Sequence, residues 1–264
     1  MKINRSPPVA LTIAGSDNSA GAGAQADLKT FAAQGVYGLT AITCVVAEIP
    51  GRVSAIQAVD EKIVAQQISL SLANYPVAAV KTGLLCTKKI IEIVAASLEK
   101  SPAPLVVDPV MVATSGDPLL EPEAVELYKT LLFPRASLVT PNLDEARTLL
   151  GREIRGIRQM RVAARDLSES FGCPILLKGG HLRGTDAIDV LFRNGNSREF
   201  SAPFVMGVHT HGTGCTYSSA ITAGIARGLD LERAIEQAKK FVTRAIATHF
   251  RWNAISALNH SARK

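Results

Sequence analysis

Residues 207–220 (GVHTHGTGCTYSSA) form an expected loop that continues directly into a helix. Gly212 and Gly214 carry no side chain that would shield the backbone, so neighbouring N–H groups can point outward together. The first N–H groups of a helix lack partners within it, and the helix dipole places partial positive charge there. Such a loop attracts an anion, for example a phosphoryl group in transfer. A glycine-rich turn that serves only packing explains the same residues, and this alternative stays open.

Cys215 follows the second of these glycines, in the first turn of the expected helix. A thiol at a helix N-terminus is placed where the dipole favours the thiolate, so we expect its pKa to be lowered. The alternative is a buried cysteine that acts as a small apolar side chain, which is the commonest fate of a free cysteine.

Polar residues end several short apolar runs: Asp17, Glu48, Asp108, Asn142 and Lys178. Ligands of open α/β sheets collect beyond the carboxyl ends of the strands, so we expect these side chains to meet at one edge. Each also has a plain structural interpretation. Asn142 and Glu145 have the spacing of a helix N-cap and its capping-box partner, for instance.

Apolar runs of strand length alternate along the chain with segments of helical periodicity. The expected strands are 9–14, 39–47, 77–81, 105–108, 137–140 and 175–178, with an edge strand or flap at 52–59 and a hairpin of 187–193 and 197–202 around Asn194-Gly195. The expected helices are 19–35, 61–73, 88–98, 122–132, 143–150, 157–171, 215–228 and 231–250. This order predicts an α/β fold, a doubly wound, mainly parallel sheet flanked by helices. We expect one domain over residues 1–264, with its core at about 9–250.

Composition excludes several classes of protein. Hydrophobic residues make up 47% of the 264 residues and charged residues 20%, which supplies a core and argues against disorder. No apolar run is long enough to span a membrane, and the first run is too short for a signal peptide. The four cysteines lack the spacing of a metal site or a disulfide framework. We therefore expect a cytoplasmic enzyme with reduced thiols and no membrane partner.

The chain is basic, with a formal net charge of +6. This charge suits anionic ligands such as nucleotides, and it raises nucleic acid as a partner. The densest basic run places arginines on one side of the expected helix 157–171: Arg152, Arg155, Arg158, Arg161 and Arg165. No aromatic residue is interleaved with them, as a single-strand binding platform requires. We therefore expect a solvated helix face and no nucleic-acid partner.

Six motifs occur in order between residues 9 and 250: AGSDNSAGAGAQADLKTF, VKTGLL, VVDPVM with SGDPLL, TPNLDEA, LLKGGHL and HGTGCTYSSAI. Together they resemble the ribokinase-like superfamily. More closely, they resemble the hydroxymethylpyrimidine and phosphomethylpyrimidine kinases of thiamin synthesis. A dinucleotide-binding fold is a weaker interpretation, because G-A-G-A-Q-A lacks the spacing of G-x-G-x-x-G.

The resemblance implies roles at the phosphate end of a kinase site. Backbone N–H groups would form the anion hole at Gly212, Thr213, Gly214 and Cys215. Cys215 stands where most of the superfamily has an aspartate base, and as thiol or thiolate it would assist proton removal. ATP contacts are implied at Asn142, Lys178, Gly179 and Thr213. A Mg²⁺ environment is implied at Asp108 and Glu145.

The substrate side implied by the resemblance comprises Gly15, Ala22, Asp27, Val46, Glu48, Leu84 and Val110. Glu48 departs from the family pattern, which has glutamine there. A glutamine amide both donates and accepts, whereas a carboxylate only accepts. Glu48 can replace both bonds to an aminopyrimidine only if it, or the ring nitrogen, holds a proton.

The implied activity is ATP- and Mg²⁺-dependent phosphorylation of 4-amino-5-hydroxymethyl-2-methylpyrimidine, with phosphorylation of its monophosphate left open. The alternative enzyme is a pyridoxal or pyridoxine kinase, which Glu48 keeps open. The remaining alternative is a non-catalytic ligand-binding protein on the same scaffold. A homodimer is expected from the family alone.

Overall fold

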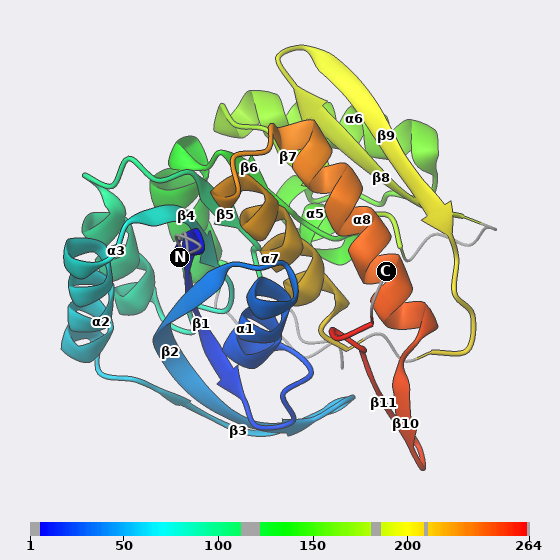
Figure 1. Cartoon of the computed structure of the whole chain (residues 1–264). Coiled ribbons are helices and arrows are strands. Elements are labelled where there is room, and N and C mark those ends of the chain that lie inside the picture. The colour runs from blue at the N-terminus through cyan, green and yellow to red at the C-terminus, as the bar shows by residue number, and fades with distance from the viewer. Residues whose placement is uncertain (1–5, 112–121, 181–185, 209–210, 263–264) are drawn as a thin grey trace, which may run out of the picture.

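The computed structural model describes residues 6–111, 122–180, 186–208 and 211–262. The SGDPLL motif, at 115–120, lies outside these residues. Within them, nine strands form one sheet in the order β3-β2-β1-β4-β5-β6-β7-β8-β9 (Figure 1). Pairing is parallel from β2 to β7, and antiparallel where β3, β8 and β9 join. The predicted mainly parallel α/β sheet is therefore confirmed.

The strands of this sheet are β1 (Val9–Asp17), β2 (Tyr37–Ile49), β3 (Arg52–Ala58), β4 (Val77–Thr82), β5 (Leu105–Val107), β6 (Leu138–Val139), β7 (Ile175–Leu177), β8 (Asp186–Arg193) and β9 (Asn196–Pro203). The helices are α1 (Gly23–Ala33), α2 (Glu61–Asn74), α3 (Lys88–Leu98), α4 (Pro122–Leu127), α5 (Leu143–Leu150), α6 (Ile157–Phe171), α7 (Thr213–Ala226) and α8 (Leu231–Ala247). The chain order reverses between β1 and β4, which makes a switch point in the sheet.

Helices cover both faces of the sheet (Figure 1). Helices α1, α7 and α8 pack on one face, and α2 to α6 on the other. The central strands alternate between the two cores: Leu105 and Val107 of β5 face one, and Val106 faces the other. This period of two buries both sides of each central strand, as a parallel sheet requires.

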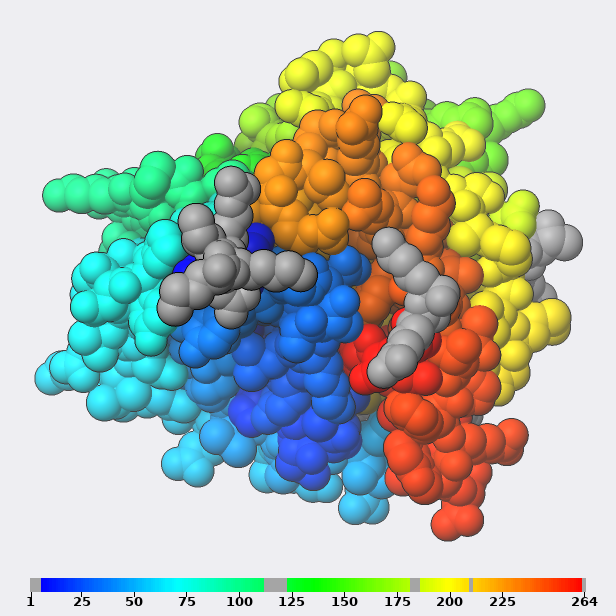
Figure 2. Space-filling model, in the orientation of Figure 1, coloured from blue at the N-terminus to red at the C-terminus, as the bar shows by residue number. Residues whose placement is uncertain are grey.

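Two elements differ from the sequence prediction. The expected helix 122–132 is α4 followed by a π-helical turn, Tyr128–Leu132, and a 3₁₀ turn, Phe133–Arg135. The expected helix 231–250 ends at Ala247, and a hairpin follows, formed by β10 (Phe250–Trp252) and β11 (Ile255–Ala257). The hairpin projects from the lower edge of the molecule (Figures 1 and 2). The hairpin lies beyond the expected helix except for Phe250, and its two three-residue strands are too short to give a clear alternating pattern.

The arginine-rich face of α6 is solvated, as predicted. Arg161 pairs with Glu199 at 2.6 Å, and Arg152 and Arg165 pair with Asp166. Each of these arginine side chains is about half exposed. Among the helices in the described residues, none is sufficiently long and apolar to span a bilayer.

Candidate active site

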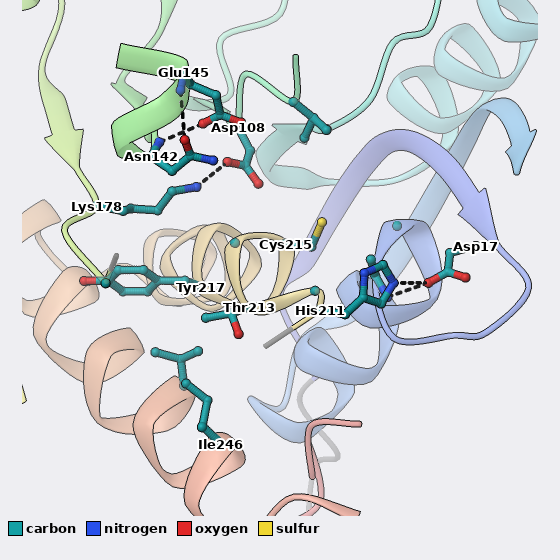
Figure 3. A pocket seen from close by; sticks show the side chains of 18 of the residues that line it. Asp17, Asp108, Asn142, Glu145, Lys178, His211, Thr213, Cys215, Tyr217 and Ile246 are labelled. Carbon is teal, nitrogen blue, oxygen red and sulfur yellow. Dashed lines mark hydrogen bonds and ion pairs between the residues drawn. The ribbon is translucent and has the colours of Figure 1, made fainter. Parts of the chain in front are cut away.

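A cavity of about 1100 Å³ opens beyond the carboxyl ends of the parallel strands. All five polar residues predicted to meet at this edge line it: Asp17, Glu48, Asp108, Asn142 and Lys178. The start of α7 lies between two polar groups, Asp108 with its neighbours on one side and the pair Asp17–His211 on the other (Figure 3). The cavity is therefore organised around the first turn of this helix.

Helix α7 begins without a side-chain cap behind Gly212, whose φ of 78° is left-handed. A Cβ at this position would lie 1.8 Å from the carbonyl oxygen of Gly21, so both conformation and close approach require glycine. Thr213, Gly214 and Cys215 line the cavity. They belong to the first turn of the helix, where the backbone N–H groups have no carbonyl partner within the helix. The buried hydroxyl of Thr213 also has no hydrogen-bond partner among the described residues. The start of α7 thus presents unpaired amides to the cavity, and anion binding at this turn stays a prediction.

Asp108, which follows β5, is buried beside the start of α7. Its Oδ1 accepts from Lys178 Nζ at 2.8 Å and from Thr140 Oγ1 at 3.1 Å, and its Oδ2 accepts from Ser218 Oγ at 3.1 Å. Burial opposes ionisation, but the nearby lysine charges, Lys178 first, hold the pKa of Asp108 below its usual range. A Cβ on Gly214 would lie 3.2 Å from Lys178 Nζ, so a cation borders the first turn of α7.

Asn142 and Glu145 form the capping box of α5. The Asn142 backbone N–H donates to Glu145 Oε2 at 2.7 Å, and the Glu145 N–H donates to Asn142 Oδ1 at 2.9 Å. The structural interpretation of the two residues is thus confirmed. Both still line the cavity. Burial raises the pKa of Glu145 to about 8, and the charge of Asp108 adds to this shift, while Lys178 opposes it.

The expected lowering of the Cys215 pKa is wrong. Burial raises the pKa of this thiol to about 12. Lys81 and a hydrogen bond from the Gly23 backbone act in the opposite direction, but they do not overcome desolvation and the charges of Asp27 and Asp108. A helix N-terminus lowers a thiol pKa only where the thiolate can also be solvated or paired.

Asp27 and Gly179 are not among the residues that line the cavity. Asp27 is fully buried, and its carboxylate bonds to Thr12, Ser219 and, at 2.9 Å, Lys81 Nζ. The structure thus gives Asp27 a buried ion pair in place of the expected substrate contact. At Gly179, an added Cβ would lie 2.1 Å from the carbonyl oxygen of Ile188, so the backbone packs closely there. The Gly179 N–H donates to Asp189 Oδ1.

The other residues expected on the substrate side line one end of the cavity: Gly15, Ala22, Val46, Glu48, Leu84 and Val110. Asp17 and His211 lie at the same end, and His211 Nε2 is 3.1 Å from Asp17 Oδ2. The sequence pattern predicts Asp17 at this edge and gives no role for His211. The two residues are 194 positions apart, so no local pattern could pair them.

The opposite end of the cavity is largely apolar and was not predicted. It is lined by Pro203, Phe204, Val205, Val242 and Ile246, with Tyr217, Asp189 and Lys239. Lys239 Nζ lies 2.7 Å from Asp189 Oδ2, and both residues are buried. A mainly apolar end of the cavity beside the start of α7 is a surface that the base of a nucleotide can occupy.

The fold and the site together define a small-molecule kinase of the ribokinase-like type. A model of the phosphomethylpyrimidine kinase family matches residues 17–259. The chain belongs to this family.

Relatives of known name agree with this family. The chain is 42% identical to the hydroxymethylpyrimidine/phosphomethylpyrimidine kinase of Rhizobium meliloti, over 90% of each chain. It is 44% identical to a thiamine biosynthesis bifunctional protein of Geobacter sulfurreducens, over 89% of this chain but 48% of that protein.

Solved structures of two kinds of kinase are similar to the chain. One is an ADP complex of Bacillus subtilis pyridoxal kinase, with a TM-score of 0.90, 36% identity and coverage of 97% of this chain and 98% of that one. Another is phosphomethylpyrimidine kinase from Clostridium difficile, with a TM-score of 0.79, 38% identity and coverage of 90% and 99%.

Proposed function

We propose that the protein transfers the terminal phosphate of ATP to the hydroxymethyl oxygen of 4-amino-5-hydroxymethyl-2-methylpyrimidine, in thiamin synthesis. The observation that carries this proposal is the uncapped start of α7, which lies between the Asp17 end of the cavity and its apolar end. The names of the relatives supply the substrate class. A nucleotide with its base in the apolar end of the cavity would direct its phosphates at the α7 amides, and the alcohol would approach them from the other end.

Catalysis on this site rests on positioning and charge. Phosphoryl transfer has a loose transition state, with charge spread over the peripheral oxygens. The amides of Gly212, Thr213, Gly214 and Cys215 are fixed before reaction, so they can stabilise that charge without reorganisation. Lys178 adds a positive charge beside the turn and, with Asn142 and Thr213, would contact the phosphates of ATP.

Mg²⁺ fits the residues present near Lys178. Asp108 and Glu145 supply carboxylate oxygens, which are the ligands that Mg²⁺ prefers, and Mg²⁺ usually keeps several waters. Burial, with the charge of Asp108, raises the pKa of Glu145 although Lys178 opposes the shift, and a bound cation would add to the effect of Lys178. A bound Mg²⁺ would neutralise phosphate charge. Asp108 and Glu145 would hold it directly or through water, while Asp108 also orients Lys178.

Cys215 would act as a thiol, because its pKa of about 12 leaves it protonated at neutral pH. In a loose transition state the alcohol loses its proton late, so a strong base is not required. We propose that the Cys215 thiol orients the hydroxymethyl oxygen and helps its proton to leave.

A pyridoxal or pyridoxine kinase is the second candidate. The TM-score of 0.90 with B. subtilis pyridoxal kinase favours it specifically. A panel assay separates the candidates: ADP formation is measured with the aminopyrimidine alcohol, its monophosphate, pyridoxal and pyridoxine. We expect the highest kcat/KM with the aminopyrimidine alcohol. A higher value with pyridoxal would replace the first proposal, and no ADP formation with any alcohol would indicate a non-catalytic protein.

A cytoplasmic homodimer is part of the same proposal. The edge strand β3 exposes Ile56, and its neighbour β2 exposes Val45 and Ile49; apolar side chains exposed together are typical of association surfaces. Sedimentation equilibrium tests the dimer: a monomeric mass at micromolar concentration would contradict it.

A further inference from the structure

Three ionisable side chains meet at the substrate end of the cavity. One ligand atom from each of Asp17, Glu48 and His211 lies within 4.8 Å of the other two. They come from the end of β1, the end of β2 and the segment before α7, and all three line the cavity. Figure 3 shows His211 directed at Asp17, next to the start of α7.

Asp17 is a fixed negative charge in this cluster. Its carboxylate accepts from the Ser19 N–H at 2.6 Å, from Ser19 Oγ at 2.9 Å and from the Ala22 N–H at 2.8 Å. The contact with His211 Nε2 makes a fourth bond. Although burial acts against ionisation, these bonds lower the pKa of Asp17 to about 2. With four bonds already made, Asp17 has little capacity left for a metal ion or a ligand.

His211 is also fixed. Because Asp17 is ionised, the imidazole Nε2 donates to it. His211 is buried, and its Nδ1 has no hydrogen-bond partner among the described residues. The Nε2–H of the imidazole is therefore already engaged in the hydrogen bond to Asp17.

Glu48 is the residue of this cluster whose carboxyl group is free to bind a ligand and to gain or lose a proton. Its backbone N–H donates to Asn18 Oδ1 at 2.7 Å, while its carboxyl group has no hydrogen-bond partner in the described part of the chain. The groups that face it are Asp17 from β1, His211 before α7 and the thiol of Cys44 on its own strand. Burial and then the charge of Asp17 raise the pKa of Glu48, and His211 opposes them. A second negative charge at this corner is therefore disfavoured.

We propose that Glu48 meets the substrate ring with one shared proton, and that Asp17, held in place by His211, is the positioning residue that keeps this proton at Glu48. The proposal rests on the proposed function. A carboxylic acid donates through O–H and accepts through C=O, which complements a ring nitrogen beside an amino group. If the proton moves to the ring, the same two bonds join a carboxylate to a cationic ring. In both forms one proton is bound.

The two hydrogen bonds between Glu48 and the ring discriminate between classes of substrate. A pyridine alcohol without an amino group beside its ring nitrogen forms only one of the two bonds. The buried corner then keeps an unpaired polar atom, which is the kind of mismatch that enzymes reject strongly. Glu48 thereby takes the place of the family glutamine and adds a dependence on pH.

The test is the KM for the aminopyrimidine alcohol between about pH 6 and pH 9. Above the pKa of Glu48, the parent must take up one proton to bind, so KM should rise by up to about tenfold per pH unit. Glu48→Gln supplies both bonds without a proton and should give a flat profile. Asp17→Asn removes the neighbouring charge, so the rise should begin at lower pH. A purely structural role for Asp17 would raise KM equally at every pH.

Glu92→Gln is the matched control, because Glu92 is exposed on α3 and should follow the parent. Calorimetry of the parent in two buffers of different ionisation enthalpy gives a measure that needs no variant. At about pH 8 it should show uptake of one proton on binding. Parallel profiles for the parent and Glu48→Gln, or no proton uptake, would overturn this inference while leaving the kinase activity in place. Turnover of pyridoxal but not of the aminopyrimidine would overturn the proposed function as well.

Discussion

Replacing Gly212 with alanine should separate the geometry of the anion-binding turn from the stability of its helix. Gly212 has a φ of 78° at the start of α7. Gly228, just beyond the end of the same helix, has a φ of 83°. A left-handed backbone costs alanine about 1–2 kcal/mol at either position. The two substitutions therefore carry similar backbone strain.

The two positions differ in the space around the new methyl group. At Gly228 nothing lies within 4 Å of the added Cβ, whereas at Gly212 the Gly21 carbonyl oxygen would lie at 1.8 Å. Relief of that contact requires the turn and residue 21 to separate by more than 1 Å, because Cβ atoms essentially never lie within 3.0 Å of another heavy atom. A misplacement of about 1 Å can cost about 100-fold in rate. We expect kcat to fall by about that factor in Gly212→Ala and by less than about twofold in Gly228→Ala.

The assay measures ADP release at saturating ATP and alcohol, alongside urea unfolding of each variant. Both variants should unfold with a free energy lower by about 1–2 kcal/mol, and the clash should add to this loss in Gly212→Ala. Activity in Gly212→Ala within about threefold of the parent would refute the reasoning, since the amides would then need no fixed position. An equal loss in Gly228→Ala would attribute the effect to helix stability instead.

Three further outcomes follow from the buried groups. Asp27→Asn leaves Lys81 as an unpaired buried cation, so it should lower the free energy of unfolding by about 3–5 kcal/mol, measured by urea titration; an altered KM at unchanged stability would restore the substrate contact expected from sequence. Cys215→Ala should lower kcat far more than it weakens ATP binding, measured by turnover and nucleotide titration; unchanged turnover would remove the thiol from the mechanism. Burial lowers the pKa of His260 from 6.5 to about 4, so the unfolded chain takes up this proton first as pH falls. Stability should therefore fall by on the order of 2 kcal/mol as the pH drops through that window. His260→Asn should flatten the profile, and an unchanged slope would contradict the assignment.

The strand-end residues of the site could be predicted because their signal is local. An apolar run followed by Asp108, Asn142 or Lys178 places the side chain at the carboxyl edge in any parallel sheet, and the structure brings all three to the cavity. The glycines of the anion-binding turn carried a similar local signal. The family motifs supplied the order in which these pieces assemble.

The remaining features depend on contacts between distant segments. The Asp17–His211 pair and the burial of Asp27 arise from the packing of α7 against the first strand and helix. Burial also raises the pKa of Cys215. The sequence indicates only the helix dipole, which acts in the opposite direction. The position of Lys81 in VKTGLL, at the end of an apolar run, was a usable signal for a buried partner of Asp27.

A crystal structure with a non-hydrolysable ATP analogue and the aminopyrimidine alcohol tests the central claim most directly. The account predicts a terminal phosphate oxygen about 3 Å from the amide nitrogens of Gly214 and Cys215. It also predicts the base between Pro203 and Ile246, and the alcohol near Glu48. A terminal phosphate bound away from the first turn of α7 would contradict the account.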